Sequence, residues 1–76
     1  MKKFMGLTVA EAQKALEKAF DKVEYREEKT EYTDGTYDIE YGFYVLDDNA
    51  DEGYYIYVED GITDDWTSMW PWQMGF

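Results

Sequence analysis

Carboxylates are the side chains in this sequence that occur in sets able to support acid–base or metal chemistry. There are 18 Asp and Glu, 7 Lys and Arg, no His and no Cys. The usual general base and the strongest nucleophile are therefore both missing. Adjacent carboxylates occur at Glu27/Glu28, Asp47/Asp48 and Asp64/Asp65. Glycosidase-type catalysis needs two carboxylates a few ångströms apart across a cleft, and a 76-residue chain has little room for one. We expect solvated charge and no enzyme.

One segment partly matches a calcium-binding loop. Asp47, Asn49 and Asp51 fit the first three ligand positions of an EF-hand loop. The match then fails, because Glu52 stands where the turn needs Gly and Val58 stands where the bidentate Glu should be. No helical pattern flanks the segment. We therefore predict no specific metal site and no cofactor.

The charge is divided unevenly along the chain. The net charge is −11, and all 7 basic residues lie in the first 29 positions. From residue 30 to residue 76 the sequence has twelve acidic residues and no basic one. Such a surface repels nucleic acid and anionic lipid and attracts basic protein surfaces. The chain also lacks a glycine-rich phosphate loop and has one arginine, Arg26, which argues against nucleotide binding.

The remaining candidate is an anionic, tyrosine-rich sheet face. We expect it to consist of Asp38, Glu40, Tyr44, Tyr55, Tyr57 and Glu59. Carboxylates spaced on a rigid sheet can stand in for nucleic-acid phosphates, and tyrosines supply rigid contact area at low entropic cost. The plain alternative is that the charge serves only solubility. The absence of basic residues over the last 47 positions favours recognition of a basic partner.

A helix is predicted over residues 9–22. Thr8 stands three residues before Glu11, which is the spacing of a capping box. An apolar stripe follows, made of Val9, Ala12, Leu16, Ala19, Phe20 and Val23. Charged residues occupy the other side, so the pattern is typical of a helix that covers one face of a sheet.

The central strand is predicted over residues 36–46, where apolar and polar residues alternate. Asp34-Gly35 separates it from a preceding strand and usually indicates a two-residue turn. A three-residue loop over 33–35 is the better prediction, because it pairs Tyr25 with Phe43 and so gathers the apolar side chains on one face. Gly35 should then adopt the left-handed conformation of a bulged type I hairpin.

A third strand, YYIYVED, follows the polar loop 47–53 and ends at the turn signal Asp60-Gly61. Tyr54, Ile56 and Val58 should face the core, with the alternate residues on the acidic face. In the tail, Trp66, Met69 and Trp70 have helical spacing before Pro71, and a short fourth strand from Ile62 is the competing interpretation. Three Trp in so short a tail predict that it folds back on the core, with an exposed aromatic anchor as the alternative.

These elements predict one compact α+β domain over residues 1–76. An N-terminal helix should pack on a three- to four-stranded antiparallel sheet in chain order, with Phe20, Ile39 and Ile56 in its core. The chain has no apolar run long enough for a membrane span. The start MKKFMGL has no apolar segment of the kind that a secretory signal needs, so a cytoplasmic protein is the default expectation.

In its charge, its small α+β domain and its tyrosine-flanked acidic strands, the chain is similar to phage-encoded inhibitors of bacterial defence, among which anti-CRISPR proteins that mimic DNA are the best-known kind. The resemblance implies a non-enzymatic inhibitor that binds a basic, nucleic-acid-binding protein by phosphate mimicry inside the host cell. It assigns no role to any single residue. Two other classes stay open: a structural or oligomeric accessory protein that uses the Trp-rich segment 66–76 as an interface, and a designed sequence with no natural partner.

Overall fold

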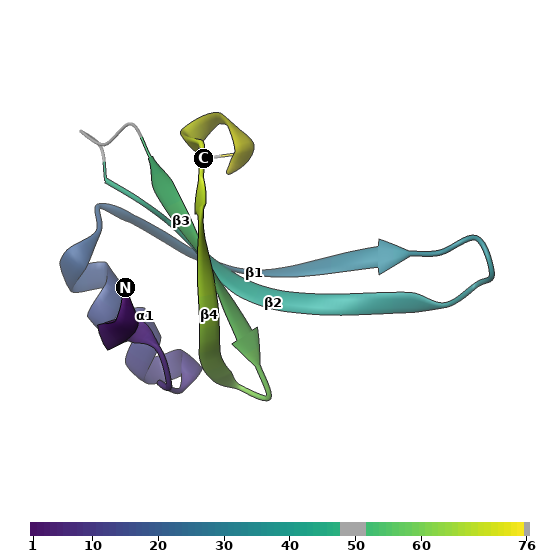
Figure 1. Ribbon diagram of the computed structural model, residues 1–76, viewed down its shortest axis with the longest axis horizontal. Helices are drawn as coiled ribbons and strands as arrows, with labels where there is room; N and C mark the ends of the chain where they lie inside the picture. Colours follow the sequence, from purple (N-terminus) through teal and green to yellow (C-terminus); the bar gives the residue numbers. More distant parts are fainter. Residues whose placement is uncertain (48–51, 76) are drawn as a thin grey trace.

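The computed structural model describes residues 1–47 and 52–75, and Figure 1 shows one helix packed beside an antiparallel sheet. A 3-10 turn at Lys2–Phe4 precedes helix α1, Val9–Ala19. Strands β1 (Lys22–Glu31), β2 (Tyr37–Leu46), β3 (Gly53–Glu59) and β4 (Ile62–Met69) follow, and a second 3-10 turn spans Pro71–Gln73. The strands lie in chain order, β1-β2-β3-β4, each antiparallel to its neighbour. The predicted α+β fold with an N-terminal helix is confirmed.

The helix begins where predicted and ends earlier. The Glu11 N–H donates to Thr8 Oγ1 over 3.2 Å and the Thr8 N–H donates to Glu11 Oε1 over 3.0 Å, which is the expected capping box. The hydrogen bonds that Glu11 Oε1 accepts from the Thr8 N–H and the Thr8 hydroxyl hold the pKa of Glu11 below its ordinary value. The predicted end at residue 22 is wrong, because α1 stops at Ala19 and Lys22 already pairs with Leu46. Val23 lies in β1 and pairs with Val45, although its spacing also fits the apolar stripe of the predicted helix.

The first hairpin has the predicted three-residue loop. Gly35 has φ 89°, and the Tyr32 N–H donates to the Thr36 carbonyl over 2.9 Å across the loop. Asp34 closes the turn by accepting from the Thr36 N–H over 3.0 Å. Tyr25 therefore pairs with Phe43, as predicted. Gly is suited to this position because side chains disfavour positive φ.

The second hairpin decides the structure of the tail. Asp60 and Gly61 have φ 53° and 77°, the left-handed pair that a tight two-residue hairpin turn requires. This turn returns the chain antiparallel to β3, so Trp66 lies in β4 and the helical interpretation of the tail is wrong. The register shifts between the pairs Ile56↔Trp66 and Val58↔Thr63, which leaves two residues of β4 opposite Tyr57 in a β-bulge.

The core lies between α1 and one face of the sheet. Its buried members include Leu16, Phe43, Val45 and Ile56, and the predicted core residue Phe20 is half-buried at its margin. The N-terminal segment closes one end. Thr63, which is buried, accepts from the Leu7 N–H over 3.0 Å at its hydroxyl oxygen, and that hydroxyl donates to the Phe4 carbonyl.

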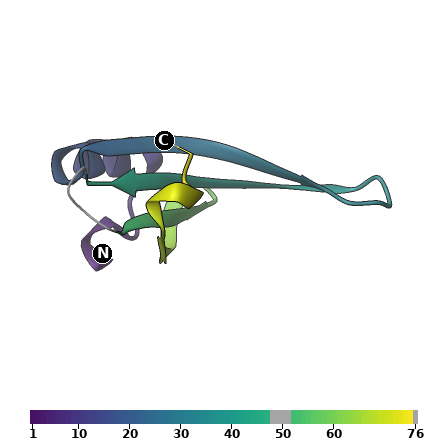
Figure 2. The ribbon, with the colours of Figure 1, turned by 90° about the horizontal axis from the view of Figure 1, so that it is seen from above.

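The hairpin of β1 and β2 extends far beyond this core. Strand β3 pairs with β2 only from Tyr41 to Val45, and the molecule measures 42 × 27 × 16 Å. Residues 27–41 therefore project as a two-stranded ribbon, which we call the arm (Figures 1 and 2). The prediction that Ile39 is a core residue is wrong: its exposed fraction is 40%. The alternation continues along β2, but β3 and the helix do not extend far enough to cover it.

Candidate protein-binding face

The acidic face is the side of the sheet opposite α1. Because Tyr25 and Phe43 point toward the helix, the residues that alternate with them along β1 and β2 point away from it. The face consists of Glu24, Arg26, Glu28, Asp38, Glu40, Tyr44, Tyr55 and Tyr57. It brings together five of the six residues predicted from the sequence. The sixth, Glu59, follows at the end of β3, where the second hairpin turns.

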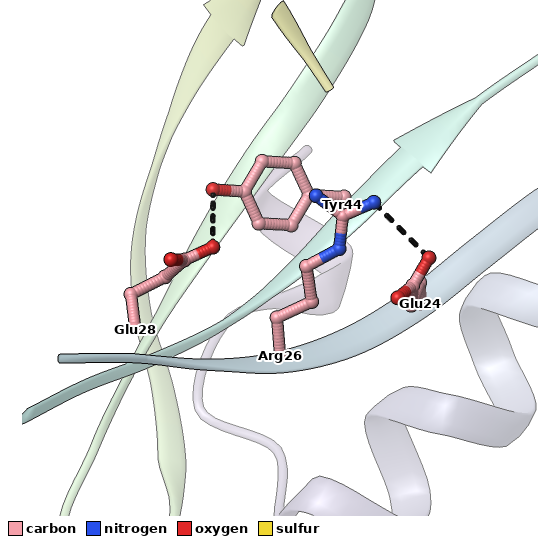
Figure 3. Close-up of polar contacts among 4 residues, drawn as sticks. All are labelled: Glu24, Arg26, Glu28 and Tyr44. Atoms are coloured by element: carbon pink, nitrogen blue, oxygen red, sulfur yellow. Dashed lines mark hydrogen bonds and ion pairs between the residues drawn. The ribbon is translucent and has the colours of Figure 1, made fainter. Parts of the chain in front are cut away.

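A cation is built into this face, as Figure 3 shows. The Arg26 guanidinium lies 4.2 Å from the centre of the Tyr44 ring, and its Nη2 pairs with Glu24 Oε2 at 3.1 Å. The Tyr44 hydroxyl donates to Glu28 Oε1 over 3.2 Å. The bond from Arg26 lowers the pKa of Glu24, while burial and the Glu28 charge raise the pKa of Tyr44. The face is therefore anionic but not exclusively so.

Arg26, Glu24 and Glu28 are not among the site residues predicted from the sequence. The signal that could have found them was the hairpin register. Once Tyr25 is set against Phe43, Arg26 stands opposite Gly42, and both neighbours of Tyr25 share a face with Tyr44. The division of charge along the chain conceals these residues, because β1 lies in the part that contains the basic residues and still contributes side chains to the acidic face.

Tyr55 lies on the predicted face but is covered. Its exposed fraction is 5%, and its ring lies over Gly42, where an added Cβ would collide with it. The rings of Tyr44 and Tyr57 flank it, with centroids at 4.8 and 4.7 Å. Within the described residues its hydroxyl has no hydrogen-bond partner, and burial raises its pKa. Tyr55 therefore lies beneath the surface of the face, and the prediction that it contacts a partner directly does not fit its burial.

The carboxylates of the arm lie at the exposed end of the face. Glu28 stands directly opposite Glu40, and Asp38 stands opposite Thr30. Asp38 Oδ2 accepts from the Tyr32 hydroxyl over 2.7 Å, which raises the pKa of Tyr32. Like charges directly opposite on a sheet repel one another, so Glu28 and Glu40 carry a cost in the isolated protein.

An open hollow adjoins the face between the arm part of β2 and the hairpin of β3 and β4. Its cavity volume is about 470 Å³, and it is lined by Ile39, Glu40, Tyr57, Val58, Glu59, Asp64 and Asp65. The β-bulge places both Asp64 and Asp65 beside Tyr57. In residues 1–47 and 52–75, no lysine or arginine is paired with any of these four carboxylates. Asp64 and Asp65 were interpreted as solvated charge, because a bulge leaves no clear mark in the sequence.

A second surface carries exposed tryptophans. The exposed fraction of Trp72 is 78%, and Trp70 is exposed beside it, whereas Met74 is fully buried. The Trp70 N–H donates to Gln73 Oε1 over 3.0 Å, which fixes the second 3-10 turn. Met74 packs against Gly53 of β3, so the prediction that the tail folds back on the sheet is right for Met74, whereas the prediction that the tail tryptophans join the core is wrong for Trp70 and Trp72. Phe76 lies outside the described residues.

The calcium-like segment falls mostly outside the described residues. Asn49 and Asp51 are not among them, while Asp47 Oδ1 accepts from the Asp21 N–H over 3.3 Å. The described part of the chain contains no group of three or more carboxylates able to hold a metal ion. The absence of a calcium site remains a prediction. Within the same residues, no helix is long and apolar enough to cross a membrane.

The chain matches no family model, no curated protein and no solved structure. Its function therefore has to be inferred from its own residues.

Proposed function

We propose that this protein is a non-enzymatic binding protein that holds a basic, nucleic-acid-binding protein through the acidic face. The observation that carries the proposal is the position of the charge. Carboxylates from all four strands lie on, or at the border of, the side of the sheet that α1 leaves uncovered, and the half-buried Tyr44 and Tyr57 lie among them. These carboxylates can bind Lys and Arg side chains as the phosphates of a nucleic-acid backbone do.

The arrangement suits phosphate mimicry because the carboxylates are held on strands. Asp38 and Glu40 lie two residues apart on one strand, which spaces them by about 6–7 Å, close to the spacing of phosphates along one strand of nucleic acid. Tyr57 adds an amphipathic contact surface that loses little entropy on binding. The field of the whole face steers association with a basic partner and weakens as salt increases.

The narrower form of the proposal is an inhibitor of a bacterial defence protein, acting in the cytoplasm of the host cell. It is supported by the resemblance in size and charge to phage-encoded inhibitors that mimic DNA. A protein of this kind acts by occupying the nucleic-acid site of its target, so duplex DNA and this protein should exclude one another.

A second candidate is an interface at the tryptophan surface. The specific observation in its favour is the exposure of Trp70 and Trp72, since large exposed apolar side chains that lie together often mark interaction sites. This candidate is an accessory or oligomeric protein whose association depends on apolar contact and changes little with ionic strength.

The experiment that separates these candidates is displacement by DNA. Immobilised protein captures partners from a bacterial lysate at low salt, and the bound material is challenged with duplex DNA. We expect DNA to release the captured proteins, and we expect a Trp72→Ala variant to capture the same set. Capture that DNA does not reverse, and that Trp72→Ala abolishes, would contradict the proposal and favour the tryptophan surface.

A further inference from the structure

We infer that the acidic face contains a binding site for one arginine side chain of the partner. This site lies between Glu28 and Glu40 and above the buried Tyr55 hydroxyl. This inference rests on the proposed function and specifies the chemistry that the face recognises. Three features of the face lead to it: a pair of carboxylates with no ion pair among the described residues, a hydroxyl with no hydrogen-bond partner among them, and an arginine that the protein already holds against a tyrosine ring and a carboxylate.

The carboxylate pair comes from the register of the arm. Glu28 in β1 is the direct partner of Glu40 in β2, so both side chains leave the same side of the sheet. Side chains directly opposite on antiparallel strands have Cβ atoms about 4.5–5.5 Å apart. Among the described residues, neither glutamate forms an ion pair, and Glu28 accepts a hydrogen bond only from Tyr44. A cation between the two carboxylates would replace repulsion with attraction.

The unpartnered hydroxyl lies beside this pair. Tyr55 extends over Gly42, which is the next position along the acidic face from Glu40. The Tyr55 hydroxyl oxygen is among the atoms nearest to the position that a Gly42 Cβ would take, so the phenol lies beside the position of Glu40, and burial followed by the Glu40 charge raises its pKa. Buried polar atoms in folded proteins almost always have a partner. A phenol oxygen can accept as well as donate, so a ligand with several N–H donors would satisfy it.

The built-in cation shows which ligand this face favours. Arg26 lies over the Tyr44 ring with Glu24 paired to it, and the Tyr44 hydroxyl also donates to Glu28 (Figure 3). Tyr57 offers a second ring beside Glu40. A guanidinium is planar and presents five donors, enough for two carboxylates and the phenol, whereas an ammonium has three donors on a compact charge. The adjoining hollow, whose lining includes Ile39 and Val58, can receive the methylene stem.

The test compares a short capped oligo-arginine peptide with an oligo-lysine peptide of the same length, titrated into the protein at low salt and followed by amide NMR. We expect the arginine peptide to bind about tenfold more tightly. The largest shifts should occur at Glu28, Glu40 and Tyr57. Glu28→Gln with Glu40→Gln should remove the preference. Tyr55→Phe, which changes no charge, should reduce it.

The matched control is Glu27→Gln with Glu31→Gln. It makes the same change in net charge on the same arm, but both residues lie on the opposite face. The control should keep the preference for arginine. The arginine site would be disproved if the parent bound the two peptides equally, or if both double variants lost the preference for arginine to the same extent. Either result would leave the proposed function unaffected. Failure of both peptides to bind at low salt would contradict the proposed function itself.

Discussion

The body of the sheet and the arm are made of the same two strands, yet they differ in what covers them. Phe43 and Val45 are fully buried beneath α1, while Ile39 and Tyr37 continue the same alternation and are exposed. The difference arises because β3 meets only half of β2. Alternation thus specifies which face is apolar, and the length of the neighbouring strand decides whether that face is buried.

Truncation in the body should have the largest effect on stability. Ile56→Ala removes a fully buried side chain from the centre of the core and should cost about 2–5 kcal/mol of unfolding free energy. A domain of this size has little stability to lose, so this change removes a large fraction of its unfolding free energy. Urea denaturation followed by tryptophan fluorescence measures the change. A loss below about 1 kcal/mol would show that the body is not packed as described.

The boundary between body and arm is most sensitive at Gly42. A methyl group there collides with the Tyr55 ring, so Gly42→Ala should displace that ring and cost about 1–3 kcal/mol. In a Tyr55→Ala background, Gly42→Ala should cost less, because the obstructing ring is gone. If the single change were neutral in denaturation, the contact between Tyr55 and Gly42 would be disproved.

Tyr55→Phe should raise stability. It removes a buried hydroxyl that has no described partner, and we expect a gain of about 1 kcal/mol at neutral pH. The direction in which the unfolding free energy changes with pH follows from the raised pKa of Tyr55. Because burial raises the pKa of Tyr55 above its unfolded value near 10, its contribution is present below about pH 10 and is lost as the pH rises further. Denaturation from about pH 8 to 11 should show a smaller decline in Tyr55→Phe than in the parent. Identical declines would contradict the assignment.

The smallest effect is expected on the arm. Ile39→Ala changes an exposed side chain that neither β3 nor α1 covers, and it should shift unfolding by no more than about 0.5–1 kcal/mol. Thermal melting of this variant beside Ile56→Ala gives the comparison directly. Equal destabilisation by the two would mean that the arm is packed as tightly as the body.

What the sequence predicted correctly was local. The Thr8–Glu11 capping box, the loop at Gly35 and the register of Tyr25 depend on neighbouring residues or on one alternation, and all are present. The α+β fold followed from them. Of the candidate face, Asp38, Glu40, Tyr44 and Tyr57 were placed correctly by the same alternation.

What the sequence missed depends on distant parts of the chain. The burial of Tyr55 requires a glycine on the neighbouring strand, at position 42, to make room for its ring. The inclusion of Asp64 and Asp65 in the hollow requires the bulge in β4, and the exposure of Ile39 requires a short β3. None of these follows from the pattern of one segment, because each depends on how two strands meet.

The central claim is that the acidic face is the binding surface, and charge reversal tests it most directly. Affinity for the captured nucleic-acid-binding protein is measured for a triple variant that combines Asp38→Lys, Glu40→Lys and Glu59→Lys. The control is a second triple variant that combines Glu17→Lys, Glu27→Lys and Glu31→Lys. The control makes the same change in net charge away from the face. We predict that the first variant loses about a hundredfold in affinity while the control keeps most of its binding. Equal affinities for the two variants would contradict the claim.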